Sequence, residues 1–326
     1  MEEPRDHYPQ ISAAGTDQEV GPAFKNDFGR YSQFSPLYTG GNGILRSCFD
    51  GNLGRWVLLK TLPEKLAKQP KDRRRLMREA RVTAQLQHPN TVPVYEMGLD
   101  HYGDVYFAMK RIEGENLFEI IRRIARGDEA TRAEFNVERM LGTLIQASLA
   151  LAYAHTHGVI HRDVKPENII IGTYGEVYLM DWGVAKVRGM AAEGDSEEID
   201  DAALFERLTI TGKRPGTPLY MSPEQVAGEE VDERTDIFSM GVVLYEALAA
   251  REPFRGRDLE ETFDNIRNAK PTPPSEIATQ WQVDRELDAI CFRALEKDPA
   301  NRFQSMFEMI RAVRRFRASK VGGDLG

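Results

Sequence analysis

Short runs of apolar and β-branched residues, each broken by polar turns, dominate the first hundred positions of the chain. Runs at 31–37, 44–49 and 56–59 are separated by clusters rich in glycine and asparagine. This pattern is typical of antiparallel strands joined by hairpins. Two further strand-like runs cover 91–97 and 105–110. We therefore predict a mainly antiparallel sheet in this part of the chain.

Helical spacing replaces the strand pattern elsewhere. A highly charged segment at 69–86 predicts one helix among the strands, and it stops before Pro89 because residues preceding proline avoid the helical conformation. Beyond Gly114, apolar residues recur every three or four positions at 138–154, whereas 236–250 is apolar nearly all round, as in a buried helix. Further helices are predicted at 258–269, 284–297 and 304–319. The expected fold is α+β, with a small β-rich lobe and a larger helical lobe.

Composition narrows the class of protein. The 326 residues are 41% hydrophobic and 29% charged, as in an ordinary globular chain. The net charge of −8 argues against a nucleic-acid partner. Two cysteines, Cys48 and Cys291, exclude a disulfide framework. The chain has no apolar run long enough for a membrane span and no secretory signal, so we expect a cytoplasmic location.

One segment carries the clearest chemical signal. Residues 161–168 read His-Arg-Asp-Val-Lys-Pro-Glu-Asn, and Asp181-Trp182-Gly183 begins thirteen positions after Asn168. Upstream, Lys60 ends a predicted strand and Glu79 follows nineteen positions later in the predicted helix. Downstream lie Gly216-Thr217-Pro218-Leu219-Tyr220-Met221-Ser222-Pro223-Glu224, Asp236 and Arg302. In this order and spacing the motifs resemble the eukaryotic-like serine/threonine protein kinases of bacteria, over about residues 31–318.

The resemblance implies transfer of the ATP γ-phosphate, which depends on alignment and charge neutralisation. Asp163 would accept or orient the proton of the substrate hydroxyl, and Lys165 would stand beside the moving phosphate. Asn168 and Asp181 would supply oxygen ligands for Mg²⁺, with Mn²⁺ as an alternative. The same resemblance implies a two-lobed kinase fold, divided into 31–112 and 113–318.

Lys60 and Glu79 match the pair that positions ATP in this family. Lys60 would hold the α- and β-phosphates, and Glu79 would fix Lys60. Taken alone, the two residues could equally form a surface ion pair, which contributes about 0–1 kcal/mol. The other motifs favour the catalytic interpretation.

The glycine-rich loop departs from the family pattern Gly-x-Gly-x-x-Gly-x-Val. The aligned positions are Tyr38, Gly40, Gly43 and Leu45, with Gly41 as an additional glycine. Backbone amides at the retained glycines could still approach phosphates. A lone Gly-Gly-x-Gly is also typical of a plain hairpin turn, and only its position before Lys60 favours nucleotide binding.

An adenine pocket follows from the same resemblance. Leu58, in place of the usual alanine, would roof the base, Met109 would be the gatekeeper, and Ile170 would pack beneath the ring. The remaining nucleotide contacts expected are Leu37 and the backbone of Lys110 and Ile112. Ordinary core packing is the alternative for these apolar residues.

Several matched residues are expected to be structural. Trp182 replaces the usual phenylalanine, and its indole N–H needs a partner if it is buried. His161 is expected to act as a packing post and Asp236 to hold the backbone of the catalytic loop. Glu224 and Arg302 resemble a buried ion pair of the helical lobe.

The substrate class is also implied by the resemblance. Lys165 and Thr217 match the serine/threonine type, in which Thr217 lines the substrate pocket, so the expected partners are proteins bearing serine or threonine. Arg162 would clamp a phosphate on Thr209 or Thr211, and autophosphorylation between molecules would require self-association. The alternative for the two threonines is a solvated strand.

Charge is concentrated in two segments. The acidic run 191–206 contains seven acidic and no basic residues, whereas 65–81 contains eight basic and two acidic residues. A solvated insert is one interpretation of the acidic run, and binding to 65–81 within or between molecules is the other.

The segments that flank the motifs are expected to lie outside the catalytic domain. Residues 1–30 lack any strand or helix period and predict a flexible leader, and 319–326 resemble a tail or linker. Two alternatives to an active kinase remain at this point. A pseudokinase serving as a binding module would be supported by Tyr38, Leu58 and Trp182, and a small-molecule kinase would generally lack the features around Glu224 and Arg302.

Overall fold

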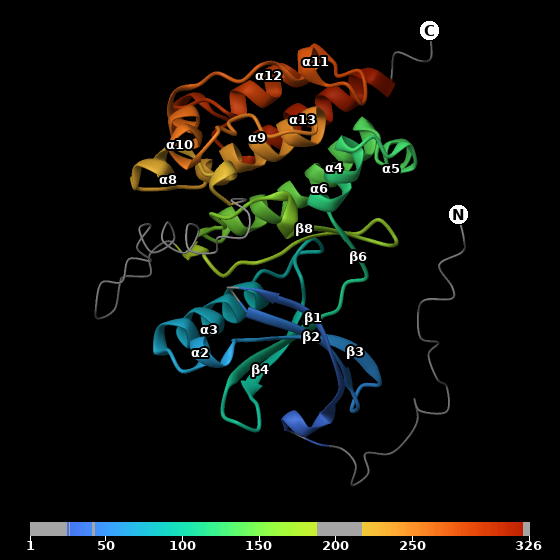
Figure 1. Ribbon diagram of the computed structural model, residues 1–326, viewed down its shortest axis with the longest axis vertical. Coiled ribbons are helices and arrows are strands. Elements are labelled where there is room, and N and C mark those ends of the chain that lie inside the picture. The colour runs from blue at the N-terminus through green and yellow to red at the C-terminus, as the bar shows by residue number, and fades with distance from the viewer. Residues whose placement is uncertain (1–24, 26, 41–42, 188–216, 322–326) are drawn as a thin grey trace. The chain divides into compact units, whose positions relative to one another are not determined.

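The computed structural model describes residues 25, 27–40, 43–187 and 217–321. The chain divides into two compact units. It passes from the first unit to the second mainly between Glu113 and Gly114. The first unit comprises Met1–Gln87, Val92–Glu113 and Thr173–Gly175, and the second comprises His88–Thr91, Gly114–Gly172 and Glu176–Gly326. A β-rich unit followed by a helical one confirms the predicted α+β class (Figure 1).

The first unit is built on an antiparallel five-stranded sheet. Its strand order is β1-β2-β3-β5-β4, so consecutive strands pair except where β5 enters between β3 and β4. The strands are β1 (Tyr31–Gly40), β2 (Gly43–Asp50), β3 (Arg55–Thr61), β4 (Val94–Leu99) and β5 (Val105–Lys110). The predicted strand at 91–97 begins three residues late, because Thr91 forms only an isolated bridge to Leu179.

Two helices complete this unit. The predicted helix is α3 (Pro70–Gln85), which begins with proline, the residue best tolerated in the first helical turn, and packs on β4 and β5. A single-turn helix that the sequence did not predict, α2 (Glu64–Ala67), precedes it. Part of the expected leader is ordered as well, since Phe28–Arg30 form a 3₁₀ helix capped by Asp27 and Phe28 packs on the core beside Tyr31.

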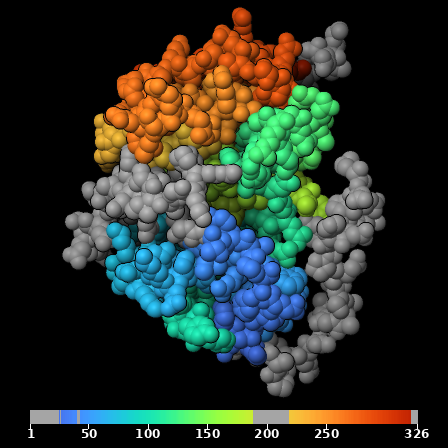
Figure 2. Space-filling model, viewed as in Figure 1, coloured from blue at the N-terminus to red at the C-terminus, as the bar shows by residue number. Residues whose placement is uncertain are grey.

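The second unit is built around two central helices. They are α6 (Val137–Thr156) and α9 (Arg234–Ala249), and α9 is buried on all sides as its apolar sequence predicts. The other helices are α4 (Leu117–Ala125), α5 (Glu129–Glu134), α8 (Pro223–Ala227), α10 (Leu259–Asn268), α11 (Pro274–Ile277), α12 (Arg285–Ala294) and α13 (Met306–Val321). Figure 2 shows the green side chains of α4–α6 meeting the orange ones of later helices in one continuous surface.

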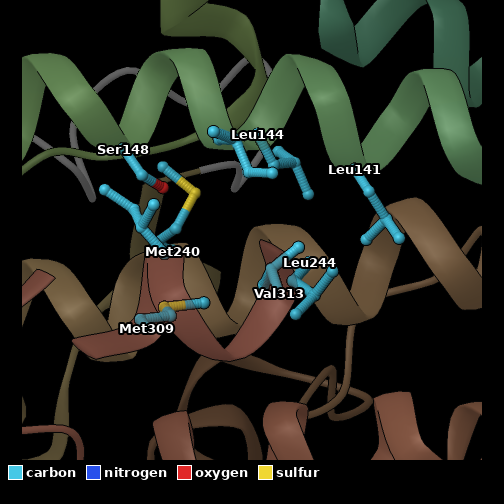
Figure 3. A pocket seen from close by; sticks show the side chains of 9 residues that line it. Leu141, Leu144, Ser148, Met240, Leu244, Met309 and Val313 are labelled. Atoms are coloured by element: carbon cyan, nitrogen blue, oxygen red, sulfur yellow. The ribbon is translucent and has the colours of Figure 1, made fainter. Parts of the chain in front are cut away.

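The core of this unit lies where α6, α9 and α13 meet. Leu141 and Leu144 from α6 point toward Met240 and Leu244 from α9 and toward Val313 from α13 (Figure 3). The three helices enclose a small apolar pocket at this point. Apolar packing of this kind fixes the helices that carry the site residues.

Short strands that the sequence did not predict frame the candidate site. They are β6 (Gly114–Asn116), β8 (Ile169–Gly172) and β9 (Val177–Leu179) in one sheet, and β7 (Val159–Ile160) paired with β10 (Lys186–Val187) in another. Strands of two to four residues are too short to show a period; β6 pairs with β8 and β7 with β10 across long sequence separations, whereas β8 and β9 form a short hairpin. None of the described helices is long and apolar enough to cross a membrane.

Candidate active site

The loop that carries Asp163 is held by a buried carboxylate on α9. Asp236 Oδ2 accepts a hydrogen bond from the backbone N–H of His161, and Asp236 Oδ1 accepts one from Arg162, both at 2.8 Å. His155 Nε2 lies 2.7 Å from the same carboxylate. Burial would raise the pKa of Asp236, but the hydrogen bond and charge of His155 and the neighbouring His161 outweigh it, so the pKa lies below its ordinary value. The loop backbone is therefore fixed as the sequence predicted.

Asp163 and Lys165 form the centre of this loop. Lys165 Nζ donates to Asp163 Oδ2 at 2.6 Å, and the Asn168 side-chain amide donates to the Asp163 carbonyl at 2.8 Å. Burial acts to lower the pKa of Lys165, but Asp163, Asp181 and Glu167 raise it above the ordinary value. The positive charge of Lys165 is therefore stabilised beside the Asp163 carboxylate.

The two predicted metal ligands lie on neighbouring segments. The backbone N–H of Met180, just before Asp181, donates to the Asn168 carbonyl at 2.8 Å, so the two loops run side by side. Because the Asn168 side-chain nitrogen donates to Asp163, the side-chain oxygen is the atom that a cation would contact, and Asp181 contributes a carboxylate. Amide and carboxylate oxygens suit a hard divalent cation, so the residues present fit the metal that the motif implies.

Trp182 lies against His161 in the interior. Their ring centroids are 4.5 Å apart, and Trp182 is 1% exposed. His161 Nε2 lies 3.0 Å from the Met180 carbonyl, so His161 packs and hydrogen-bonds as expected. Trp182 Nε1 is buried and has no hydrogen-bond partner in the described part of the chain. The need for a partner that the sequence indicated is therefore not met by any described residue.

Lys60 and Glu79 form an ion pair within the first unit, joining β3 to α3. Each side chain is only 9% exposed. This burial separates the pair from ordinary surface ion pairs, which are solvated and contribute little. The geometry therefore favours a positioned lysine over an incidental surface contact.

The residues expected around the nucleotide fall in two groups. Within the sheet of the first unit, Leu45 is opposite Lys60, and Leu58 is opposite Met109. Leu58 and Met109 are buried, and the Lys110 N–H donates to the Pro93 carbonyl at 2.9 Å. Ile112 follows β5 in this unit, whereas Ile170 lies on β8 of the second unit.

The hairpin between β1 and β2 exposes its side chains. Leu37 is 57% exposed and Tyr38 is 60% exposed. Gly40 pairs with Gly43, which has a φ of 154°, and a Cβ at Gly43 would lie 3.1 Å from the Thr61 carbonyl. Glycine at 43 thus lets the hairpin lie close to β3, whereas Gly41 lies outside the described residues.

The expected regulatory segment is described only at its ends. Thr209, Thr211 and the acidic run 191–206 lie outside the described residues, and Thr217 opens a 3₁₀ helix at Thr217–Tyr220. Arg162, with a φ of 65°, donates through Nε to the Val184 carbonyl at 2.7 Å.

The sequence analysis missed two polar residues, His155 and Glu246. His155 carries no motif in the sequence, yet it contacts Asp236. Glu246 on α9 is 4% exposed and accepts a hydrogen bond from the Tyr220 hydroxyl at 2.7 Å. No motif or period in the sequence singles out either residue, because both depend on contacts between distant segments.

The comparisons with known proteins agree with this geometry. The model of the protein kinase domain family matches residues 31–312, and the chain belongs to that family. The chain is 33% identical over 306 residues to the serine/threonine-protein kinase PknD of Protochlamydia amoebophila, covering 92% of this chain and 31% of PknD. It is 36% identical over 285 residues to a probable serine/threonine-protein kinase of Streptomyces coelicolor, covering 86% of this chain and 39% of that protein. The chain therefore spans less than two fifths of the length of these relatives.

Proposed function

We propose that this chain is a serine/threonine protein kinase that transfers the γ-phosphate of ATP to hydroxyl groups of proteins. The contact between Lys165 and Asp163 at 2.6 Å, fixed through Asn168, is the observation that carries the proposal. A carboxylate can orient an acceptor hydroxyl while a neighbouring cation offsets the charge on the moving phosphoryl group, and phosphoryl transfer is catalysed mainly by such positioning and charge stabilisation. The names of the bacterial relatives support the same acceptor class.

Each site residue then has a specific task. The Asp163 carboxylate orients the acceptor hydroxyl and receives its proton as the oxygen–phosphorus bond forms. Lys165 offsets the negative charge on the transferring phosphoryl group, and Lys60, held by Glu79, binds the α- and β-phosphates. The bond to the ADP oxygen breaks in the same displacement.

A divalent cation completes the proposal. When bound, it would neutralise charge on the ATP phosphates, and Asn168 and Asp181 would hold it. We propose Mg²⁺ in preference to Mn²⁺, because amide and carboxylate oxygens are the ligands that Mg²⁺ uses in nucleotide enzymes. Initial rates at matched free concentrations of the two ions would decide the preference.

Regulation by autophosphorylation is part of the proposal. We propose that Thr209 or Thr211 is the acceptor and that Arg162 binds the resulting phosphate. Phosphopeptide mapping after incubation with Mg-ATP should find phosphate on one of them. An active chain with phosphate on neither threonine would refute this assignment.

The domain limits and location are proposed on the same grounds. We place the kinase domain at 31–318 together with Phe28–Arg30, which pack on its core, and with the end of α13, which continues to Val321 into the segment expected to be a linker. Because the reaction uses ATP, we propose that the domain works in the cytoplasm.

One assay tests the activity. The full chain, radiolabelled ATP, Mg²⁺ and a generic protein substrate should give phosphoserine or phosphothreonine. The matched variant Asp163→Asn, which keeps the size of the side chain, should lower the rate at least 100-fold, since a positioned base contributes about 10²–10⁴-fold. Nucleotide binding without transfer would instead identify a pseudokinase, and transfer to a small alcohol alone would identify a small-molecule kinase.

A further inference from the structure

Helix α3 presents a row of cations to solvent. Lys71, Arg74, Arg78 and Arg81 are all exposed. At 3.6 residues per turn they lie within an arc of about 80° and extend over about 15 Å. We call these four residues the α3 basic face.

The acids of α3 lie on the other side of the helix. Asp72 and Glu79 are both buried, and Glu79 is paired with Lys60. Neither carboxylate is on the arc that carries the basic face. The helix therefore separates its charges, with the Lys60 pair facing inward and the cations facing out.

The arginines of this face are not paired nearby. In the described part of the chain, the guanidinium groups of Arg74, Arg78 and Arg81 contact no carboxylate. Some exposed arginines elsewhere do, as Arg257 does with Glu261 at 2.9 Å, whereas others, such as Arg311, do not within the described residues. Like charges four residues apart destabilise a helix, so an anionic partner would offset the repulsion along this row.

The chain itself contains a segment of matching charge. The acidic run 191–206 has seven carboxylates and no cation, so it cannot neutralise itself. It ends three residues before Thr209, a proposed autophosphorylation site. Phosphorylation of one copy by another requires the copies to meet.

We propose that the α3 basic face binds the acidic run of a second copy of this chain. The proposal rests on the proposed kinase function, which it deepens by naming the surface through which copies associate. Attraction between exposed charges is screened by salt, with a Debye length of about 10 Å at 0.1 M. The association should therefore weaken steeply as ionic strength rises.

Sedimentation equilibrium of the full chain without nucleotide tests the proposal. We expect reversible association at low salt, and the triple variant R74E/R78E/R81E should weaken it at least about tenfold, a conservative figure for losing several charge contacts. Replacing the seven acids of 191–206 by their amides should weaken it similarly. Reversing both segments together should restore association.

A matched control comes from α13. Arg311, Arg314 and Arg315 are also exposed and contact no carboxylate in the described part of the chain. The variant R311E/R314E/R315E makes the same change in net charge and should leave association unchanged. Circular dichroism of each variant checks folding.

Three results would overturn the proposal. They are the absence of association at low salt, equal weakening by the α3 and α13 variants, and crosslinks from Lys71 to 191–206 that form only within one chain in a mixture of isotopically light and heavy protein. Asp163→Asn should associate like the unaltered chain. Failure of association with intact kinase activity would refute this inference alone, whereas association without transfer would refute the proposed function.

Discussion

Arg302 and Glu224 form a bidentate ion pair in the interior of the second unit. Arg302 Nη1 and Nη2 each donate to a different carboxylate oxygen of Glu224 at 2.7 Å. Arg302 is 1% exposed and also donates through Nε to the Glu296 carbonyl at 2.8 Å. Burial would raise the pKa of Glu224, but Arg302 lowers it below the ordinary value. The pair ties α8 to the segment before α13.

Removing one partner of this pair should be costly. We expect Arg302→Met to lower the free energy of unfolding by about 3–5 kcal/mol, because the Glu224 carboxylate would remain buried without its partner. Urea denaturation measures the change. As a control, Arg257→Met removes the exposed pair with Glu261 and should leave the free energy of unfolding almost unchanged, because solvent screens such pairs. Similar losses in the two variants would contradict the prediction.

Glu246 should make stability depend on pH. Burial, followed by the charge of Glu252, raises the pKa of Glu246 to about 8, and Glu167 adds to the rise while the Tyr220 hydrogen bond and Arg255 oppose it. A carboxyl with a pKa of about 4.3 in the unfolded chain binds fewer protons there than in the fold. Stability should therefore fall as pH rises from about 4.3 to about 8.

The substitution Glu246→Gln should remove that slope. Glutamine can still accept the Tyr220 hydrogen bond but does not ionise. Unfolding free energies at pH 5.5 and 8 should converge in this variant, and the variant should be the more stable protein at pH 8. The exposed Glu260→Gln serves as the control and should leave the slope as it is. An unchanged slope in Glu246→Gln would show that another group titrates.

Trp182→Phe should be tolerated. A buried N–H without a partner destabilises the fold by about 1–3 kcal/mol, and the variant removes the one on Trp182, which lacks a described partner. The variant also loses apolar contact that stabilises the fold by a comparable amount. We expect a net change within about 1 kcal/mol and retained phosphoryl transfer, because Asp181 is untouched. Thermal unfolding and the kinase assay measure both. A loss above about 2 kcal/mol would indicate that the indole N–H has a partner.

The end of α9 offers a simple gain in stability. Ala250 caps this helix in the left-handed conformation with a φ of 53°, where alanine is strained and glycine is not. Ala250→Gly should raise the free energy of unfolding by about 0.5–1 kcal/mol, because relief of the left-handed strain outweighs the extra freedom of glycine in the unfolded chain. The same substitution one residue earlier, Ala249→Gly, lies in the helix and should lower it by about 1 kcal/mol. Chemical denaturation measures the change in unfolding free energy of each variant. Changes of the same sign in the two variants would contradict this account.

Local chemistry made much of this protein predictable from its sequence. The hairpins around β2 and the apolar helix α9 follow from turn residues and from hydrophobic spacing, which act over a few positions. The motif at 161–168 predicted that Asp163, Lys165 and Asn168 lie together, and hydrogen bonds join them within one short loop. The end of the leader was predicted less well. The sequence around Phe28 shows no hydrophobic period, and Phe28 is ordered by packing beside Tyr31.

Only the tertiary structure decided how distant residues share an environment. The sequence predicted that Asp236 begins a buried helix, but its contact with His155 at 2.7 Å exists because α6 and α9 pack together. The short strands β6, β7 and β10 likewise lack any internal signal, since two or three residues gain stability only from partners far along the chain. The raised pKa of Glu246 and the burial of the Trp182 N–H arise for the same reason, because burial belongs to the packed fold and not to the segment.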